Sequence, residues 1–422
     1  MKHHQKLACL VQNNSIINTI KKSLTKLDFS TNVLEFTDLN GLLKTLNDDI
    51  DYVLIDMDNQ NIDFKQLLQV AKDQYPSIIR ILLAETWTPQ IVIMANQIAH
   101  LVLEKKQIES HLIDLFKKAD RLRHLLQNKD LIKMVNSYEQ VPILKPVYME
   151  LLHKLQGHEV SLKQIGEFVE GDIALSTKVL QVSNMAVFSK LVPITSPKQA
   201  VVHLGINVLR ALILYIQLYE LNSSKLQFLK FLKNMEKHSL TVAKHTKIFA
   251  EEFNLDKLEQ NDCFTVGFLH DIGKLVIAEK VDNWEEIQQY AKDQHIPLWQ
   301  AEEKILGTSH AEIGGYLLGI WGFPAEIIDA VAYHHKPSGS ENYSLSPTTF
   351  VHIAEAMLQE EAHSDEETFQ RYLDIEYLEK LNIKEGVLEL YKKYYGKDEK
   401  ESIPLVDDEP MSDDLKGDDE YK

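Results

Sequence analysis

The stretch FLHDIGKLV, residues 268–276, places a histidine and an aspartate side by side within an apolar run. These are His270 and Asp271, and Lys274 follows one helical turn later, on nearly the same face as His270. Burying such a pair without a partner is costly, so we expect either a bound metal ion or a mutual hydrogen bond. Imidazole and carboxylate groups are the ligands that first-row divalent metals use in proteins.

The remaining candidate ligands lie elsewhere in the chain. They are His238, His310, His334, His335 and Glu355. Adjacent residues of a helix point about 100° apart, so His270 and Asp271 can hold one ion together only at a special backbone position, with ligands from other helices. A site of this kind would bind one or two divalent ions, with Fe, Mn or Mg as candidates, and would activate water to attack phosphorus. In this hypothesis Asp271 bridges the ions and Lys274 holds a phosphate oxygen, which makes both of them candidate catalytic residues.

Each candidate ligand also has a purely structural interpretation. His238 follows a charged run at the expected start of a helix and could be a capping or surface residue. His310 could hydrogen-bond a neighbouring helix, and one of His334 and His335 could face water. Glu355 could be an ordinary surface or salt-bridged acid. The function depends on whether these side chains converge in space, which the sequence leaves open.

The composition favours a protein with large apolar cores and an acidic surface. Hydrophobic residues make up 44% of the 422, and 63 acidic against 45 basic side chains give a formal net charge of −18. Such a surface repels phosphate backbones, so binding to nucleic acid or to an anionic membrane is not expected. No segment approaches the roughly 18 apolar residues of a membrane span, and the N-terminal apolar run is too short for a secretory signal, so we expect a cytoplasmic protein. Cys9 and Cys263 are expected to be reduced core thiols.

Residues 1–105 alternate strand-like and helix-like segments, which predicts an α/β domain with a parallel sheet covered by helices. The strand-like segments are KLACLV, DYVLIDMD, IIRILLAE and AHLVLEKK. A connecting helix over residues 106–137 is predicted from a heptad stripe made of Ile108, Leu112, Leu115, Ala119, Leu122 and Leu126. This helix would either mediate a homodimer or pack against the chain's own domains.

The remainder of the chain up to residue 395 is predicted to be almost wholly helical, with residues 341–395 as a C-terminal helical extension. GINVLRALILYIQLYEL, residues 205–221, is apolar around most of its circumference and is expected to be a buried core helix. Residues 396–422 carry many acids and few large apolar groups, which predicts a disordered acidic tail.

Residues 1–105 resemble the receiver domain of bacterial response regulators, which implies a five-stranded parallel sheet. DYVLIDMD places Asp56 at that family's phosphoacceptor position, and LVLEKK places Lys105 at the position of its lysine. Asn13 and Asn14 stand where the family has its Mg²⁺-binding acids, and Ala84 stands where it has a hydroxyl. Neutral amides are weak Mg²⁺ ligands and phosphoryl transfer needs a cation, so Asp56 should be a poor acceptor. We therefore expect a pseudo-receiver that serves docking or dimerisation, which acetyl-phosphate labelling of Asp56 tests.

The candidate ligands resemble, in their order, those of the HD superfamily of metal-dependent phosphohydrolases. HDIGK in particular resembles the HD-GYP cyclic di-GMP phosphodiesterases, in which a histidine, a His-Asp pair, a histidine, a His-His pair and an acid follow one another. The matching residues here are His238, His270, Asp271, His310, His334, His335 and Glu355. The sequence departs from that family in two ways. KPSGSENYSLSP follows His335, so the glycine-tyrosine-proline signature is absent, and the closing acid, Glu355, is not aspartate.

Three further segments resemble the HDOD domain, an HD-like all-α bundle found in bacterial signalling proteins and often fused to receivers. They are VPILKPVYMELLHKL, SLKQIGEFVEGDIALSTKVLQVSNMAVF and PITSPKQAVVHLGINVLRALIL. Together with HDIGK and YHHKP, they predict an HDOD domain over residues 138–340. Members of that family generally lack demonstrated catalysis because many have lost ligands, whereas this sequence keeps an unusual number of them.

The sequence leaves three functions open. In the first, the HDOD domain is a non-catalytic output module that binds a signalling protein or a nucleotide, coupled to the pseudo-receiver. In the second, it is a metal-dependent phosphodiesterase or phosphohydrolase acting on a cyclic dinucleotide or a related phosphoester. In the third, a bound metal only braces the fold. Metal analysis combined with a hydrolysis assay separates the three.

Overall fold

The structure, a computed structural model, describes most of the chain. It covers residues 4–27, 30–58, 63–85, 98–136, 162–188, 194–221, 226–281, 283–340, 342–359 and 365–395. The segment VPILKPVYMELLHKL and the predicted acidic tail, residues 396–422, lie outside the described residues.

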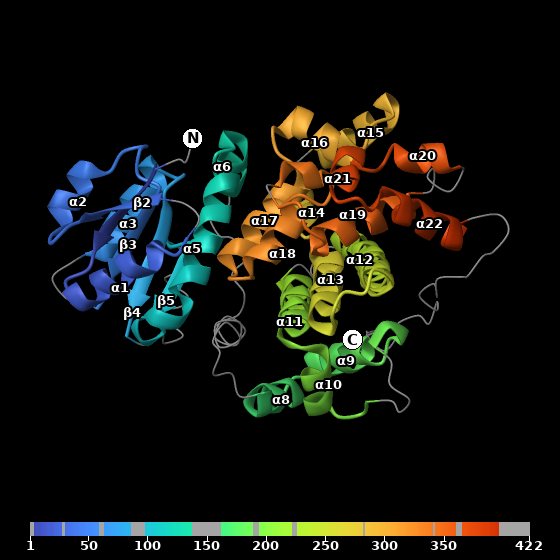
Figure 1. The fold of residues 1–422 in the computed structure, drawn as a ribbon, viewed down its shortest axis with the longest axis horizontal. Coiled ribbons are helices and arrows are strands. Elements are labelled where there is room, and N and C mark those ends of the chain that lie inside the picture. The colour runs from blue at the N-terminus through green and yellow to red at the C-terminus, as the bar shows by residue number, and fades with distance from the viewer. Residues whose placement is uncertain are drawn as a thin grey trace, which may run out of the picture.

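A five-stranded sheet forms the core of the N-terminal domain (Figure 1). Its strands are β1 (His4–Leu10), β2 (Ser30–Glu35), β3 (Tyr52–Asp56), β4 (Ile79–Ala84) and β5 (Leu101–Glu104). The strand order is β2-β1-β3-β4-β5, and every neighbouring pair is parallel. Parallel neighbours require crossover connections, which helices provide between the first four strands along the chain. The predicted α/β domain with a parallel five-stranded sheet is confirmed.

Helices cover both faces of this sheet. They are α1 (Asn14–Leu24), α2 (Leu39–Thr45), α3 (Phe64–Gln74) and, after the 3₁₀ turn η1 (Lys105–Gln107), α5 (Ile108–Leu125). Successive strand residues point to opposite faces, so Leu7 and Cys9 of β1 pack with α1 and α5, whereas Ala8 and Leu10 pack with α2 and α3. Cys9 and Cys263 are both buried and free, as predicted for core thiols.

The segment predicted as one connecting helix, residues 106–137, contains two helices instead. After α5 the chain turns and continues as α6 (Lys129–Asn136). The side-chain oxygen of Asn128 accepts hydrogen bonds from the backbone N–H groups of Asp130 (3.0 Å) and Leu131 (3.2 Å), which starts a new helix at this point. The apolar stripe of α5 is buried in the core, as expected for a helix that packs against the chain's own domains.

The rest of the described chain is helical, which confirms the predicted all-α region. Its elements are α8 (Leu162–Glu170), α9 (Ile173–Ser183), η2 (Ala186–Phe188), α10 (Pro197–Leu204), α11 (Ile206–Leu221), α12 (Leu226–Glu252), α13 (Lys257–Leu269), α14 (Gly273–Lys280), α15 (Trp284–Gln294), α16 (Leu298–Leu306), α17 (His310–Ile320), α18 (Ala325–Ala332), η3 (Pro337–Gly339), α19 (Pro347–Leu358), α20 (Glu366–Gln370), α21 (Ile375–Lys380) and α22 (Lys384–Tyr395). Figure 1 shows α11, α12 and α13 at the centre of this region, with α8 to α10 on one side of them. Residues 208–217 of α11 are buried, as predicted for a core helix.

Three glycines let helices α14, α17 and α18 approach one another closely. A Cβ atom on Gly273 would lie 2.0 Å from the carbonyl oxygen of His310, so only glycine fits there. A Cβ atom on Gly315 would lie 2.7 Å from the Cβ of Ala332, and one on Gly314 would lie 3.3 Å from the backbone nitrogen of Gly273. This close packing brings together the helix ends that carry the candidate ligands.

Helix α5 joins the N-terminal domain to the helical region. Leu122 is fully buried and fills the space beside Gly319 of α17. Next to it, Arg121 Nε lies 2.9 Å from Asp329 Oδ2 of α18. One apolar core therefore runs from one face of the sheet, through α5, into the helical region.

Among the described residues, no single helix is both long enough and apolar enough to span a membrane. The pair α10 and α11, bent by 117° relative to one another, meets the length and composition criteria only when both helices are taken together.

Candidate metal centre

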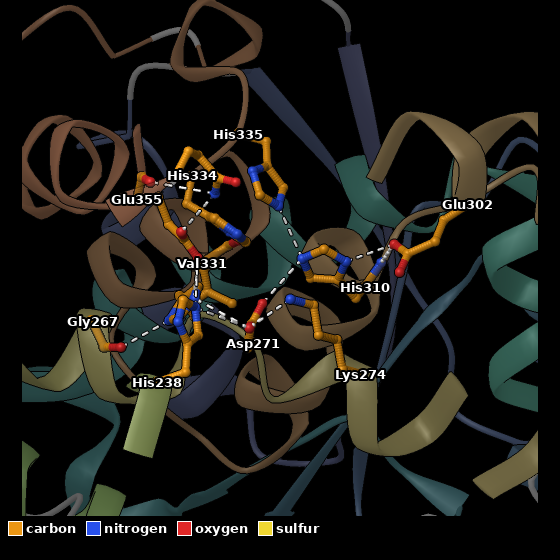
Figure 2. A network of polar contacts seen from close by, with 12 residues as sticks. His238, Gly267, Asp271, Lys274, Glu302, His310, Val331, His334, His335 and Glu355 are labelled. Atoms are coloured by element: carbon orange, nitrogen blue, oxygen red, sulfur yellow. Dashed lines mark hydrogen bonds and ion pairs between the residues drawn. The ribbon is translucent and has the colours of Figure 1, made fainter. Parts of the chain in front are cut away.

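The structure brings all seven predicted ligands together, and Figure 2 shows most of them around one site. His310, His334 and His335 form one group, here called the three-histidine group. The other, called the four-ligand group, consists of His238, His270, Asp271 and Glu355. Within each group, one ligand atom from every residue lies within 4.8 Å of the others. Metal binding by either group stays a prediction.

A break between two helices allows His270 and Asp271 to point into one site. Helix α13 ends at Leu269 and α14 begins at Gly273. In the turn between them the backbone N–H of Lys274 donates to the carbonyl of Asp271 at 2.8 Å, an i to i−3 bond that tightens the chain. His270 and Ile272 keep right-handed helical dihedral angles in this turn, yet His270 Nε2 and Asp271 Oδ2 lie only 3.3 Å apart, so the two side chains reach one site.

Two imidazole rings of the site are oriented by backbone carbonyls. His270 Nδ1 donates to the carbonyl of Gly267 (2.8 Å), and His334 Nδ1 donates to that of Val331 (2.7 Å). A carbonyl can only accept, so Nδ1 carries a proton in both rings and Nε2 faces the site. His334 Nε2 is buried and has no hydrogen-bond partner. Metal-binding histidines are held in this way, with one nitrogen donating outward and the other free for the ion.

Asp271 belongs to the four-ligand group and also faces His310 of the three-histidine group, as Figure 2 shows. Its Oδ1 is 3.2 Å from His310 Nε2, whereas its Oδ2 is 3.3 Å from His270 Nε2 and 3.6 Å from His238 Nε2. Oδ2 also accepts a hydrogen bond from Lys274 Nζ at 2.6 Å. Each carboxylate oxygen therefore faces a different group, which is the geometry that a bridging ligand requires.

Glu355 is buried beside two histidines, so it is not a surface acid, and its interpretation as an ion-paired acid is consistent with the structure. It lies in α19, whose residues 348–357 are all buried, and its side chain is only 7% exposed. Its Oε1 is 2.7 Å from His270 Nε2 and 3.0 Å from His238 Nε2. The longer arm of glutamate, compared with the aspartate of the HD-GYP pattern, thus reaches both rings.

The solvent-facing side of the cluster is formed by His238, Lys274 and His335. The side chains of His238 and Lys274 are 37% and 20% exposed, whereas those of His270 and Asp271 are at most 2% exposed. His238 lies well inside α12, so the expectation that it begins a helix is wrong. His335 is half-buried and is the more exposed member of the His-His pair, although it does not simply face water, because its Nε2 lies 3.0 Å from His310 Nε2.

Carboxylate charge dominates the electrostatics of the cluster. Burial alone would lower the pKa of His270, but the carboxylates of Asp271 and Glu355 outweigh it and raise that pKa to about 10. Burial alone would raise the pKa of Asp271, yet His270 and Lys274 hold it well below its ordinary value. By contrast, burial keeps the pKa of His334 well below 6.5, so that ring stays neutral. Anionic carboxylates beside the neutral ring of His334 are donors that fit a divalent metal ion.

Two buried residues that the sequence did not single out support the cluster. Glu302 of α16 accepts a hydrogen bond from His310 Nδ1 at 2.6 Å. His352 had no assigned role, but its Nδ1 lies 2.8 Å from the carbonyl oxygen of His334, and its Nε2 accepts from the backbone N–H of Asp374 at 2.8 Å. Neither residue lies in a recognisable motif, so only the fold reveals that they hold the ligands or the chain around them.

In the N-terminal domain, the candidate acceptor Asp56 is engaged in an ion pair. Asp56 is buried, and its Oδ1 lies 2.7 Å from Lys105 Nζ, which is also 2.9 Å from Asp58 Oδ2. The side-chain oxygen of Asn13 accepts from the first backbone N–H groups of α1, so it serves as a helix cap. Strand β4 ends at Ala84, the position expected to lack a hydroxyl. The phosphoacceptor role of Asp56 stays untested.

Comparison with known proteins identifies the helical region. The family model of the HDOD domain matches residues 141–337, so the chain contains an HDOD domain there, as the sequence motifs suggested. The parallel sheet that precedes it is compatible with a receiver-like domain.

The match between this chain and each curated relative covers only part of the relative's length. An uncharacterized protein of Treponema pallidum is 25% identical over 213 residues, which are 49% of this chain and 40% of that protein. A ribonuclease Y of Deinococcus radiodurans is 30% identical over 169 residues, 39% of this chain and 24% of that protein. The chain thus spans less than half the length of these curated relatives. A solved HDOD domain protein with unknown function from Geobacter sulfurreducens aligns with a TM-score of 0.45 and 21% identity, covering 65% of this chain and 98% of that one.

Proposed function

We propose that the HDOD domain binds divalent metal ions and hydrolyses a phosphodiester, within a bacterial signal-transduction protein. The observation that carries this proposal is the pair of ligand groups with Asp271 between them. Enzymes that cleave phosphodiesters commonly use two neighbouring ions, which act on the attacking and the leaving oxygen. A single structural ion needs only about four ligands, fewer than converge here. Nitrogen-rich donors favour Fe or Mn over Mg, which prefers oxygen.

Each residue of the site has a defined part in this proposal. Ions held by the two groups would supply Lewis acidity and a bound water with a lowered pKa. Asp271 contacts both groups through its two oxygens, and the Nε2 lone pairs of His334 and His270 point inward. Lys274 stands on the solvent-facing side, where its ammonium group can leave Asp271 and bind a non-bridging phosphate oxygen as charge develops there.

The substrate class is a phosphodiester, with cyclic dinucleotides as the first candidates. The resemblance of HDIGK to the HD-GYP enzymes supports this class, whereas the missing glycine-tyrosine-proline signature indicates a differently shaped pocket. The name of the ribonuclease Y relative also denotes an enzyme of phosphodiester chemistry. A panel of cyclic dinucleotides, a short RNA and bis(p-nitrophenyl) phosphate therefore covers the chemistry that the site supports.

Replacing Lys274 by glutamine tests the catalytic part of the proposal. We expect turnover of the panel to fall by about 10²-fold or more, because one donor to the developing charge is lost. The metal content should stay unchanged, since glutamine removes no ligand of either group. Lys292→Gln, at an exposed position of α15, is the matched control and should keep both properties. Unchanged turnover in Lys274→Gln would refute the role of this lysine.

A non-catalytic output module is the second candidate, and one contact favours it. Lys274 Nζ already neutralises Asp271 at 2.6 Å, so the cluster has internal charge partners that could hold it together without turnover. Metal content and hydrolysis separate the alternatives. Metal with turnover supports the enzyme, metal without turnover supports a braced fold, and neither supports a module that binds a signalling protein or nucleotide.

For the N-terminal domain we propose a docking or dimerisation role without phosphorylation. Lys105 and Asp58 enclose Asp56, and the oxygen of Asn13 is used to cap α1, so the groups that would hold Mg²⁺ are missing or engaged. The partner is a signalling protein or a second copy of the chain.

A further inference from the structure

Glu302 is a carboxylate in the protein interior that the proposed chemistry does not use directly. It lies in α16, its side chain is completely buried, and Figure 2 shows it on the far side of His310 from Asp271. Its Oε2 accepts two hydrogen bonds from His310, one from Nδ1 at 2.6 Å and one from the backbone N–H at 2.8 Å. Its Oε1 is buried without a hydrogen-bond partner.

The unpaired oxygen Oε1 makes this arrangement costly for stability, because a buried carboxylate oxygen that accepts no hydrogen bond is unfavourable. What Glu302 does provide is orientation. A carboxylate can only accept from Nδ1, so it fixes a proton on the outer nitrogen of His310 and turns Nε2 inward. Nε2 then faces Asp271 Oδ1 at 3.2 Å and His335 Nε2 at 3.0 Å.

The same helix also contacts a second ligand of the three-histidine group. Trp299 lies one turn before Glu302, and its ring stacks on that of His335, with centroids 5.6 Å apart and an angle of 14° between the planes. Helix α16 thus orients two of the three histidines of this group. In the four-ligand group, His270 is oriented instead by the carbonyl of Gly267.

We infer that Glu302 is a positioning residue for His310 that controls metal occupancy of the three-histidine group and leaves the four-ligand group intact. This inference rests on the proposed function, because it assumes that both groups bind metal. Beyond that function, it assigns the two ions to different supports: binding of one ion depends on α16, and binding of the other depends on the turn between α13 and α14.

The test measures ions bound per chain, by elemental analysis of the full chain titrated with Mn²⁺. In Glu302→Gln, which keeps an oxygen but loses the charge, we expect one of the two ions to bind about 10- to 100-fold more weakly. Glu302→Ala should lose that ion altogether. The neighbouring exposed Glu303→Gln is the matched control and should bind like the parent. Equal weakening of both ions, or of neither, would overturn the inference.

A second readout does not depend on metal. Long-range proton–nitrogen NMR spectra of the metal-free protein report which ring nitrogen of His310 carries the proton. We expect Nδ1–H in the parent and in the Glu303→Gln control, and a mixture of tautomers in Glu302→Ala. An unchanged tautomer in Glu302→Ala refutes the positioning role. If the parent shows Nδ1–H but binds no metal, the proposed function fails while the orientation by Glu302 stands.

Discussion

At the residue scale, the site depends on acceptor atoms that face one another. His270 carries its proton on Nδ1, which donates to Gly267, yet its Nε2 lies 2.7 Å from a carboxylate oxygen of Glu355. Two acceptors at that distance need either a second proton on the ring or a cation between them. The raised pKa of His270 shows that the proton is held strongly when no metal is present. Metal binding must therefore release a proton.

The pH dependence of stability follows from this competition. The folded-state pKa of His270 is about 10, above its ordinary value of 6.5, so its protonation stabilises the metal-free fold fully below pH 6.5. That contribution is lost as the pH rises through about 10. In the presence of a chelator, we expect the melting temperature to fall more steeply between pH 7 and pH 9.5 in the parent than in His270→Gln. With saturating Mn²⁺ the difference should reverse. Parallel pH profiles for the parent and the variant would contradict the assignment.

Sequence patterns located the histidines but not all of the acids. The apolar residues of α16 suggest that Ile305 faces the core, but Ile305 is 42% exposed and Glu302 is fully buried. The spacing of apolar residues could not reveal that Glu302 is buried and Ile305 exposed, because Glu302 is held inside by hydrogen bonds from His310, a residue of another helix. For Glu355, the surrounding run of apolar residues in α19 was the available indication that it is buried. The sequence left that acid between a ligand and a surface residue.

At the element scale, the ligands are placed by helix ends that meet at glycines. Asp271 lies two residues before Gly273, the first residue of α14, and His310 is the first residue of α17. Gly273 allows the backbone of α14 to touch the carbonyl of His310. Glycine in HDIGK is thus required by the approach of two backbones, and the distance between Asp271 and His310 depends on it.

Replacing Gly273 by alanine tests this packing. The added methyl group would lie 2.0 Å from the carbonyl oxygen of His310, so α14 and α17 must separate. We expect the free energy of unfolding to fall by about 1–3 kcal/mol and the metal content to decrease. Gly41→Ala in α2, where the new atom meets only ordinary contacts, is the control and should be neutral or stabilising. A Gly273→Ala protein as stable as the control, with full metal content, would refute the account of this glycine.

The predictable elements were those with an unbroken apolar pattern. Strands β1, β3, β4 and β5 were each marked by an apolar run. Strand β2, STNVLE, has only Val33 and Leu34 as apolar residues, so it could not be located from its pattern. The connecting helix was predicted as one element because its heptads run on to Leu126. A local cap at Asn128 breaks it, and capping hydrogen bonds leave little trace in apolar spacing.

At the scale of the whole molecule, one face of the sheet shares an apolar core with the helical region. Leu122 of α5 sits at the junction, fully buried beside α17. The N-terminal domain is therefore in contact, through α5, with the helix that begins at His310. Any partner that displaces α5 would act on the candidate metal centre by this route.

Thermal unfolding tests the shared core. We expect the parent to unfold in one cooperative transition, because the described core residues of one sheet face and of the helical region form one cluster. Leu122→Ala should lower the free energy of unfolding by about 2–5 kcal/mol and shift the whole transition. Leu258→Ala, at a 75% exposed position, is the control and should have little effect. Two separate transitions in the parent, with Leu122→Ala shifting only one, would contradict a continuous core.

The most direct test of the central claim is the metal content of the full chain after reconstitution with Mn²⁺ or Fe²⁺ and removal of free ions. We predict about two ions per chain in the parent and almost none in Asp271→Asn, whose neutral amide cannot bridge two cations. A parent protein that retains no metal, or an Asp271→Asn variant that retains as much as the parent, would contradict it.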